Sequence, residues 1–560
     1  MKRIHGRTRW GRLATILGAA AVTVLQCLAV PAFAGFELPP GERITNLPAI
    51  PRNMPQKEAY ESYDPVIGRN FDIKNLWMRA DLRVRPEMRN NTCFGAQINA
   101  NGSCNTFGTR GNAAGGGNKG NDFFVQQWMR LGIGYDLSPD VNFYVEVIDS
   151  ATWGGNGNPT NAGNGGDPLN HNGGSIAGSG GGNNGRLGVR AAYMLIRNLA
   201  DVQGLSMKVG RQYVIFGNHS LFGHFDWANT GYSHDGVMFA YQTKAWDSYF
   251  GWFRNSESDI GQATPVGSGG PNIAGNASGS DANRDADMFI FYNQIKSIPG
   301  MVIEPFYVYY KNNYGSSAVA GVGNQAFGLG TAKHANQTRH MIGNRIELRK
   351  GGFDFSNEVA WQFGQMGQAG ACAGDQKCLH INAWATRNWI GYTFYDTAWK
   401  TRLAFNLDYA SGDSRNNTCG ATPGSCKTAN TFENFFPTNH IHMGYMDVQA
   451  WKNMLSPSVN LQARPSARDH IELWYTNLNL ANSKDCWYRG GQGCYVFSNA
   501  ANTKTHIGDE IDVAYTRMFA DGKVALQATY GTIFSGGYLT STLNQQVNQH
   551  WAYMSLWMNF

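Results

Sequence analysis

The stretch LWMRADLRVRPEMR, residues 76–89, decides the fold. Apolar side chains occupy its even positions, and a charged side chain occupies each odd position from Arg79 to Arg89. Because successive side chains of a strand point to opposite faces, this alternation predicts a β-strand with one apolar and one ionic face. The same pattern recurs near residues 141–147, 342–349 and 402–409. We therefore expect a protein built from many such strands.

The composition favours one large β-domain over several ordinary ones. Among the 560 residues, 69 are glycine, 13% are aromatic and only 15% are charged. An all-β barrel can use a chain of this length in a single domain. No run of about 18 apolar residues follows residue 34, so a helical membrane span is not expected. A secreted chain of this kind can still span a membrane as a closed barrel.

The first 34 residues have the form of a secretory signal peptide. Five basic residues precede an apolar segment, and Ala32-Phe33-Ala34 supplies the small residues of a cleavage site. Cleavage after Ala34 would lower the formal net charge from +6 to +1, so the basic pI says little about partners. Residues 35–75 contain six prolines and no periodicity, and we interpret them as a periplasmic extension, or a segment lying in the barrel mouth, that precedes a barrel at residues 76–560.

Short and long connections alternate along the chain. Eight short turns are expected near residues 138–140, 200–204, 243–246, 296–300, 349–352, 394–397, 465–469 and 520–522. Long Gly/Asn/Ser-rich connections include residues 154–185, 255–283, 315–337 and 411–457. Eight turns join sixteen strands, and the strands at the two chain ends raise the expected count to about 18. Short periplasmic turns and long extracellular loops are typical of an outer-membrane antiparallel β-barrel.

The eight cysteines beyond residue 34 form four neighbouring couples. These are Cys93/Cys104, Cys372/Cys378, Cys419/Cys426 and Cys486/Cys494. Each couple lies in a long Gly/Asn/Ser-rich connection, which predicts a local disulfide in an oxidising compartment. Zinc is the competing interpretation, but no couple has C-x2-C spacing. His440-Ile441-His442 is interpreted as a loop or packing element, and no metal or cofactor is expected.

The ionic face of each strand must point into the barrel, because a charge facing lipid at the midplane costs about 2 to 4 kcal/mol. The candidate lumen residues are Arg79, Asp81, Arg83, Arg85, Glu87, Arg89, Arg130, Arg190, Arg345, Arg349 and Arg402. Guanidinium groups stay charged and bind carboxylates, which suits the passage of an acidic solute. The alternative is that they only pair with wall acids, such as Glu146, Glu347, Asp408 and Glu472, and stiffen the wall.

Residues 208–241, KVGRQYVIFGNHSLFGHFDWANTGYSHDGVMFAY, carry the family signal. Together with DYASGD at 408–413 and FENFFPTNHIHMGYMD at 432–447, this segment resembles the alginate export family of outer-membrane proteins. The resemblance spans roughly residues 71–560 and implies an 18-stranded monomeric barrel. The best-known member exports a polyuronate through an arginine-lined pore, but many relatives lack an alginate pathway, so the solute stays open.

The connection after residue 212 is a candidate constriction. Asp226, Asn229, His234 and Asp235 lie where a loop could fold inward, although turn chemistry explains these residue types equally well.

These features predict an outer-membrane channel, not an enzyme, for passive passage of anionic small solutes or acidic polysaccharide. The alternatives are a general, weakly selective porin and a structural or receptor barrel plugged by residues 35–75 or by loops. A barrel enzyme would need an ordered catalytic set, and His440 and His442 near Asp447 do not supply one. Expected partners are outer-membrane lipid, the transported solute, a periplasmic or cell-surface protein, and the barrel assembly machinery. The chain ends in WAYMSLWMNF, which resembles the C-terminal signature by which that machinery recognises outer-membrane proteins. No nucleic acid is expected.

Overall fold

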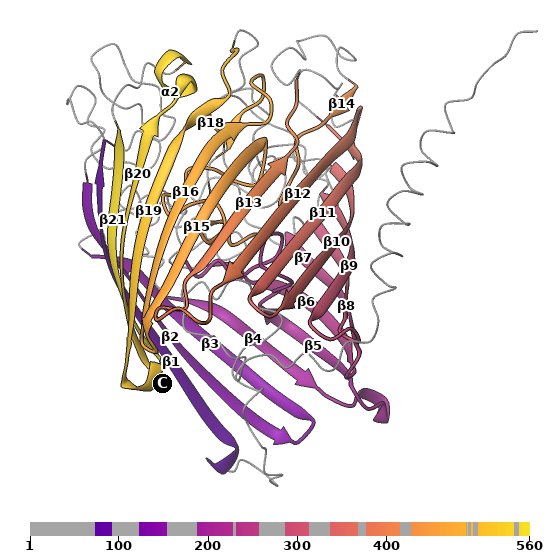
Figure 1. The fold of residues 1–560 in the computed structure, drawn as a ribbon. Helices are drawn as coiled ribbons and strands as arrows, with labels where there is room; N and C mark the ends of the chain where they lie inside the picture. Colours follow the sequence, from indigo (N-terminus) through magenta and orange to yellow (C-terminus); the bar gives the residue numbers. More distant parts are fainter. Residues whose placement is uncertain are drawn as a thin grey trace, which may run out of the picture. The chain divides into compact units, whose positions relative to one another are not determined.

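The protein is a closed antiparallel β-barrel of 18 strands, drawn in Figure 1. The computed structural model describes residues 73–91, 122–153, 187–227, 231–256, 286–312, 337–367, 377–414, 427–488, 490, 494–496, 502–542 and 548–559. The barrel strands are β1 (Leu76–Asn90), β2 (Asp122–Ser138), β3 (Val141–Thr152), β4 (Leu187–Ile196), β5 (Leu205–Gln212), β6 (His234–Gln242), β7 (Trp246–Ser256), β8 (Ala286–Ile295), β9 (Met301–Asn312), β10 (Gln337–Lys350), β11 (Phe353–Met366), β12 (Leu379–Thr393), β13 (Arg402–Ala410), β15 (Met454–Ser466), β16 (Asp469–Leu480), β19 (His506–Phe519), β20 (Val524–Ser535) and β21 (Gln549–Asn559).

The remaining described elements are short. They are the strands β14 (Thr428–Ala429), β17 (Trp487–Tyr488) and β18 (Cys494–Val496), the single-turn helices η2 (Ile73–Asn75), η3 (Leu199–Asp201), η4 (Asn439–Ile441) and η5 (Ala520–Gly522), and the helix α2 (Gly537–Thr542). None of the helices in the described residues has the length and apolar character needed to cross a membrane.

Each barrel strand pairs with the next one along the chain, as the order of labels in Figure 1 shows. β13 pairs directly with β15, and β16 pairs with β19. The first strand also pairs with the last, with Arg83 opposite Trp557 and Val84 opposite Leu556. Since this pairing leaves neither terminal strand unpaired, the barrel is closed and its backbone hydrogen bonds are satisfied within the wall.

All eight predicted short turns are confirmed, because each lies between two paired strands at one end of the barrel. One predicted loop boundary is wrong. The connection expected at residues 411–457 ends before Met454, where β15 begins. Pro457 lies inside that strand. Proline lacks a backbone N–H and is uncommon within a sheet, so the sequence favours a loop at this position.

Burial alternates along the strands as the sequence pattern predicts. In β1, Met78 and Met88 are exposed, whereas Asp81, Arg83 and Glu87 are buried. Exposed apolar side chains of this kind cover the outer face of the wall. The period-two alternation therefore separates a lipid-facing surface from an ionic inner surface.

Candidate functional site in the barrel lumen

Two long connections fold into the barrel and pack against each other. We call residues 213–233, between β5 and β6, inner loop A, and residues 427–453, before β15, inner loop B. Residues 228–230 of inner loop A lie outside the described part. Phe222 and Phe436 form a parallel backbone bridge, and Gly223 N donates to Phe436 O at 2.8 Å. Thr438 N donates to His219 O at 2.9 Å. The two loops thus form one packed unit.

Aromatic side chains join the two loops further. Phe222 and Phe435 stack with ring centroids 5.8 Å apart, and Trp227 lies on His440 at 3.5 Å with an interplanar angle of 4°. His440 Nδ1 lies 2.9 Å from Asp447 Oδ2. The His440-Ile441-His442 segment is therefore part of the loop packing. Among the described residues, no cluster of three or more His, Cys, Asp or Glu is arranged to hold a metal ion.

A basic wall, formed by Arg83 and Arg85 of β1, Arg130 of β2 and Arg190 of β4, holds inner loop A. Arg83 Nη1 donates to the main-chain oxygens of Asp226 and Trp227 at 2.5 and 2.9 Å. Arg85 Nη1 donates to the Trp227 oxygen at 2.6 Å, and its guanidinium lies 3.6 Å from the Trp227 ring centroid.

Asp226 lies between two arginines of the basic wall. Its carboxylate accepts from Arg130 Nη1 at 2.9 Å and from Arg190 Nη2 at 3.0 Å. Burial by itself would raise the pKa of Asp226, but Arg130, His224 and Arg190 hold that pKa well below its ordinary value. Asp226 therefore stays ionised and fixes inner loop A to the wall through charge-assisted hydrogen bonds.

The other predicted residues of β1 form ion pairs along the same inner face. Arg79 Nη2 lies 2.8 Å from Asp81 Oδ2. Glu87 accepts from Arg85 Nε at 2.6 Å and from Arg89 Nη2 at 3.3 Å. In these contacts arginines of the wall pair with acids of the wall, which is the alternative that the sequence analysis left open.

Across β9 to β13 the strand register lines up a row of alternating charge. Arg345 is opposite Glu304 on one side and Glu358 on the other, and Glu358 is opposite Arg387. Arg387 Nε lies 3.1 Å from Asp408 Oδ2. Opposite charges on facing strands stabilise a sheet, and here they also neutralise one another.

Two more predicted arginines lie near the short-turn end. Arg349 Nε is 3.6 Å from Glu347 Oε1, and Glu347 also pairs with Arg345. Arg402 binds Asp354 through two nitrogens, at 2.6 and 2.8 Å.

An acidic wall, formed by Glu472 of β16 and Glu510 and Asp512 of β19, holds inner loop B. Tyr445 N donates to Asp512 Oδ2 at 3.1 Å, and Met446 N donates to Glu510 Oε1 at 2.9 Å. The Tyr445 hydroxyl donates to Glu472 Oε2 at 2.7 Å. Among the described residues of β15, β16, β19 and β20, no arginine or lysine is buried.

Several inward-facing residues were not identified as lumen residues from the sequence. Arg339 donates to Gln337 and Gln362, and Arg387 donates to Ser220 of inner loop A at 2.7 Å. Arg339 lies on the same alternating face as Arg345, and Glu510 lies on the same face as Asp512. The period-two rule could therefore have identified both.

The candidate constriction residues divide between two elements. Asp226 lies in inner loop A, whereas His234 and Asp235 begin β6. Asn229 lies outside the described residues.

Two of the four predicted cysteine couples, Cys93/Cys104 and Cys419/Cys426, lie wholly outside the part of the chain that the structure describes. Five of the eight cysteines, Cys93, Cys104, Cys372, Cys419 and Cys426, lie outside it, and the side chain of Cys494 is not described. For each couple, therefore, the structure describes at most one of the two cysteine side chains. The four pairings stay predictions.

Cys378 lies at the end of the connection between β11 and β12. It directly precedes β12, which begins at Leu379, and so lies in the long connection that the sequence predicts. Its side chain is partly buried against an apolar cluster of Met366, Leu379, Ile381 and Ala429.

Cys486 is also more enclosed than a polar loop suggests. It is fully buried and packs with Ala450 and Tyr488. Both described cysteine side chains therefore lie in packed surroundings.

A closed 18-strand barrel with an apolar outer face and an ionic inner face defines an outer-membrane protein of the channel class. The chain belongs to the alginate export family, whose description is "Alginate export" and whose model matches residues 76–553. This family and this fold are those of transport channels rather than enzymes.

Solved porin structures share the fold at low sequence identity. Pseudomonas aeruginosa OccK9 (OpdG) is 10% identical with a TM-score of 0.50, over 87% of this chain and 99% of its own. Acinetobacter baumannii OccAB3 is 7% identical with the same TM-score and the same coverage. No curated protein matches the chain.

Proposed function

We propose that this outer-membrane channel passes anionic solutes passively, either small carboxylates or acidic polysaccharide. The observation that carries the proposal is how the basic wall is held. Arg83 and Arg85 donate to main-chain oxygens of inner loop A, and Arg85 Nη2 also donates to Gln126 at 2.5 Å. These acceptors carry no net charge. Arg85 also pairs with Glu87 at 2.6 Å, but Arg89 shares that carboxylate, so the positive charges exceed the negative one on this face of β1.

Charge held beside a constriction acts strongly on a passing ion. Low-dielectric walls focus the field of fixed charges into a narrow opening, which raises the local concentration of ions of opposite sign. The candidate lumen arginines that pair fully with carboxylates, such as Arg345 and Arg402, contribute little to this field. We assign the selecting role to Arg83 and Arg85.

The zero-current potential of the purified full-length protein in a planar bilayer under a KCl gradient tests this proposal. We expect a potential of the sign that marks anion selectivity, and a smaller one for Arg83→Gln with Arg85→Gln. Arg517→Gln is the matched control, since its side chain lies on the exposed outward side of β19. A cation-selective wild type, or equal potentials for all three proteins, would contradict the proposal.

The inward position of both loops favours a second candidate, a receptor or structural barrel whose lumen is filled. That candidate predicts no conductance in the same bilayer. Release of the loops by Asp226→Ala should then open a conducting path that the wild type lacks.

We also propose assignments for the parts of the chain that lie outside the described residues. Residues 1–34 are a signal peptide, residues 35–75 are a periplasmic extension, and the cysteine couples are disulfides of the long loops. Mass spectrometry of the mature protein, with and without reduction, should give an N-terminus at Gly35 and four intramolecular disulfides. A retained leader or free thiols would contradict these assignments.

A further inference from the structure

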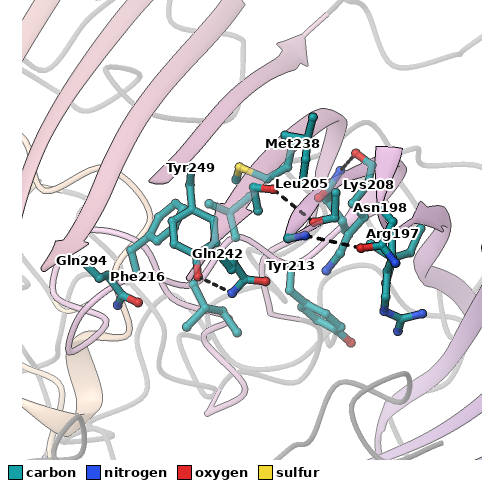
Figure 2. A pocket seen from close by; sticks show the side chains of 17 residues that line it. Arg197, Asn198, Leu205, Lys208, Tyr213, Phe216, Met238, Gln242, Tyr249 and Gln294 are labelled. Atoms are coloured by element: carbon teal, nitrogen blue, oxygen red, sulfur yellow. Dashed lines mark hydrogen bonds between the residues drawn. The ribbon is translucent and has the colours of Figure 1, made fainter. Parts of the chain in front are cut away.

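A separate cavity of about 440 Å³ lies under inner loop A at the short-turn end of β4 to β8. Its wall comes from β4 to β8 and its cover from residues 213–216 (Figure 2). Its volume falls within the range of about 300 to 1,000 Å³ that is common for small-molecule sites. None of the arginines of the basic wall lines it.

The charges that line this cavity are positive. Arg197 and Lys208 contribute cations, and no aspartate or glutamate is among the described lining residues. Arg197 Nη1 donates to Pro139 O at 3.4 Å and to the Asn142 side chain, both uncharged acceptors. Lys208 Nζ lies 4.8 Å from the Tyr193 ring centroid. These groups position the two cations at the edge of the cavity, and Arg197 also interacts electrostatically with Asp136 of β2.

The acids behind the lining are engaged by other groups. Gln294 Nε2 donates to Glu304 Oε1 at 2.6 Å, and Glu304 forms an ion pair with Arg345. The Tyr213 hydroxyl donates to Glu146. The cavity therefore presents amide and phenol groups in front of these carboxylates.

The opposite side of the cavity is aromatic. Phe216 stacks on Tyr292 with centroids 4.3 Å apart and meets Tyr249 edge-on at 5.4 Å. Leu205 of β5 and Met238 of β6 add apolar lining between the two ends, and Met238 is the strand partner of Lys208. Figure 2 shows Phe216 and Tyr249 on one side and Lys208 and Arg197 on the other. The cavity thus has a cationic end and an aromatic end.

We propose that this cavity binds a small aromatic carboxylate, with the carboxylate at Lys208 and Arg197 and the ring against Phe216 and Tyr249. An ammonium or guanidinium group binds a carboxylate through charge-assisted hydrogen bonds, and aromatic side chains favour offset or edge contacts with a ring. A sugar acid fits less well, because its hydroxyl groups would lose water against Leu205 and Met238 without gaining partners. The inference rests on the proposed function in one respect, since it names a class of anionic solute.

Calorimetric titration of the detergent-solubilised full-length protein with sodium benzoate tests this site without requiring conductance. Benzoate should bind, and benzamide, its neutral analogue, and glucuronate, a hydroxylated carboxylate, should each bind at least about tenfold more weakly. Lys208→Met should weaken benzoate binding by about tenfold or more. Lys244→Met is the matched control, because Lys244 is exposed in the turn before β7 and does not line the cavity.

Tyr249→Leu should weaken benzoate binding by about threefold through loss of ring contact, and it provides a second test if Lys208→Met fails to fold. Absence of benzoate binding, equal affinity for glucuronate, or equal effects of Lys208→Met and Lys244→Met would overturn the proposal. The bilayer potential depends on Arg83 and Arg85, so an anion-selective channel that does not bind benzoate would overturn this inference alone.

Discussion

The basic wall and the acidic wall hold the two inner loops through opposite ends of the peptide group. Arg83 and Arg85 donate to main-chain oxygens of inner loop A. Glu510 and Asp512 accept from main-chain N–H groups of inner loop B. Each of these contacts anchors a wall side chain on an uncharged backbone group, and Arg85 also pairs with Glu87.

This difference separates two properties that a single residue combines. Anchoring depends on hydrogen-bond geometry, whereas selectivity depends on the sign of the charge. Substitutions that keep one property and remove the other can therefore compare the walls directly.

The largest expected effect is on the anchoring of inner loop A. Asp226→Ala leaves Arg130 and Arg190 buried without their shared carboxylate, which should destabilise docking of residues 213–227 by about 3 kcal/mol. Hydrogen exchange of the backbone amides in this segment should accelerate by about 100-fold.

Asp235→Ala is the matched control for Asp226→Ala. Asp235 accepts from Arg211 at the same 2.9 Å distance, but its side chain is 51% exposed. A surface ion pair contributes about 0 to 1 kcal/mol, so exchange should change little. Equal effects of the two variants would contradict the assignment of Asp226 as the anchor.

A smaller effect is expected when the basic wall keeps its charge but loses its forked geometry. Arg83→Lys with Arg85→Lys should weaken docking of inner loop A by about 1 to 2 kcal/mol, because an ammonium group cannot reproduce the paired donation of a guanidinium. The zero-current potential should stay anion-selective. Loss of selectivity in this variant would mean that geometry, not charge, sets it.

On the acidic wall, removal of charge should leave the anchor in place. Glu510→Gln with Asp512→Asn retains side-chain oxygens that accept from Met446 N and Tyr445 N, so exchange in inner loop B should change by less than about 1 kcal/mol. The zero-current potential should become more anion-selective. A shift toward cations would contradict the role of the wall charges.

The smallest expected effect is that of moderate acid on inner loop A. The pKa of Asp226 is lowered below the ordinary 3.8, so its stabilising charge is present above that ordinary value and is lost only as pH falls below it. Exchange protection of residues 213–227, corrected for the intrinsic rate, should therefore be constant from about pH 8 to pH 5. Loss of protection near pH 6 would mean that another group controls docking.

Local sequence patterns were sufficient to predict the strands of the barrel. Period-two alternation in residues 76–89 predicts β1 and the inward direction of Arg83 and Arg85, because lipid excludes the opposite orientation. The eight short turns predict the strand count for the same local reason.

The interior of the barrel could not be predicted in this way. Arg83 meets Asp226 at a separation of 143 residues, and Phe222 bridges to Phe436 across an even longer separation. Such contacts depend on closure of the barrel, and no local periodicity reports them. The sequence therefore identifies the wall arginines but not the main-chain oxygens that hold them.

The central claim is that the wall charges control ion selectivity from opposite sides. The zero-current potentials of Arg83→Gln with Arg85→Gln and of Glu510→Gln with Asp512→Asn, measured against wild type in one KCl gradient, test it most directly. We predict shifts of opposite sign, toward cations for the first pair and toward anions for the second. Shifts of the same sign, or no shift in either, would contradict the account.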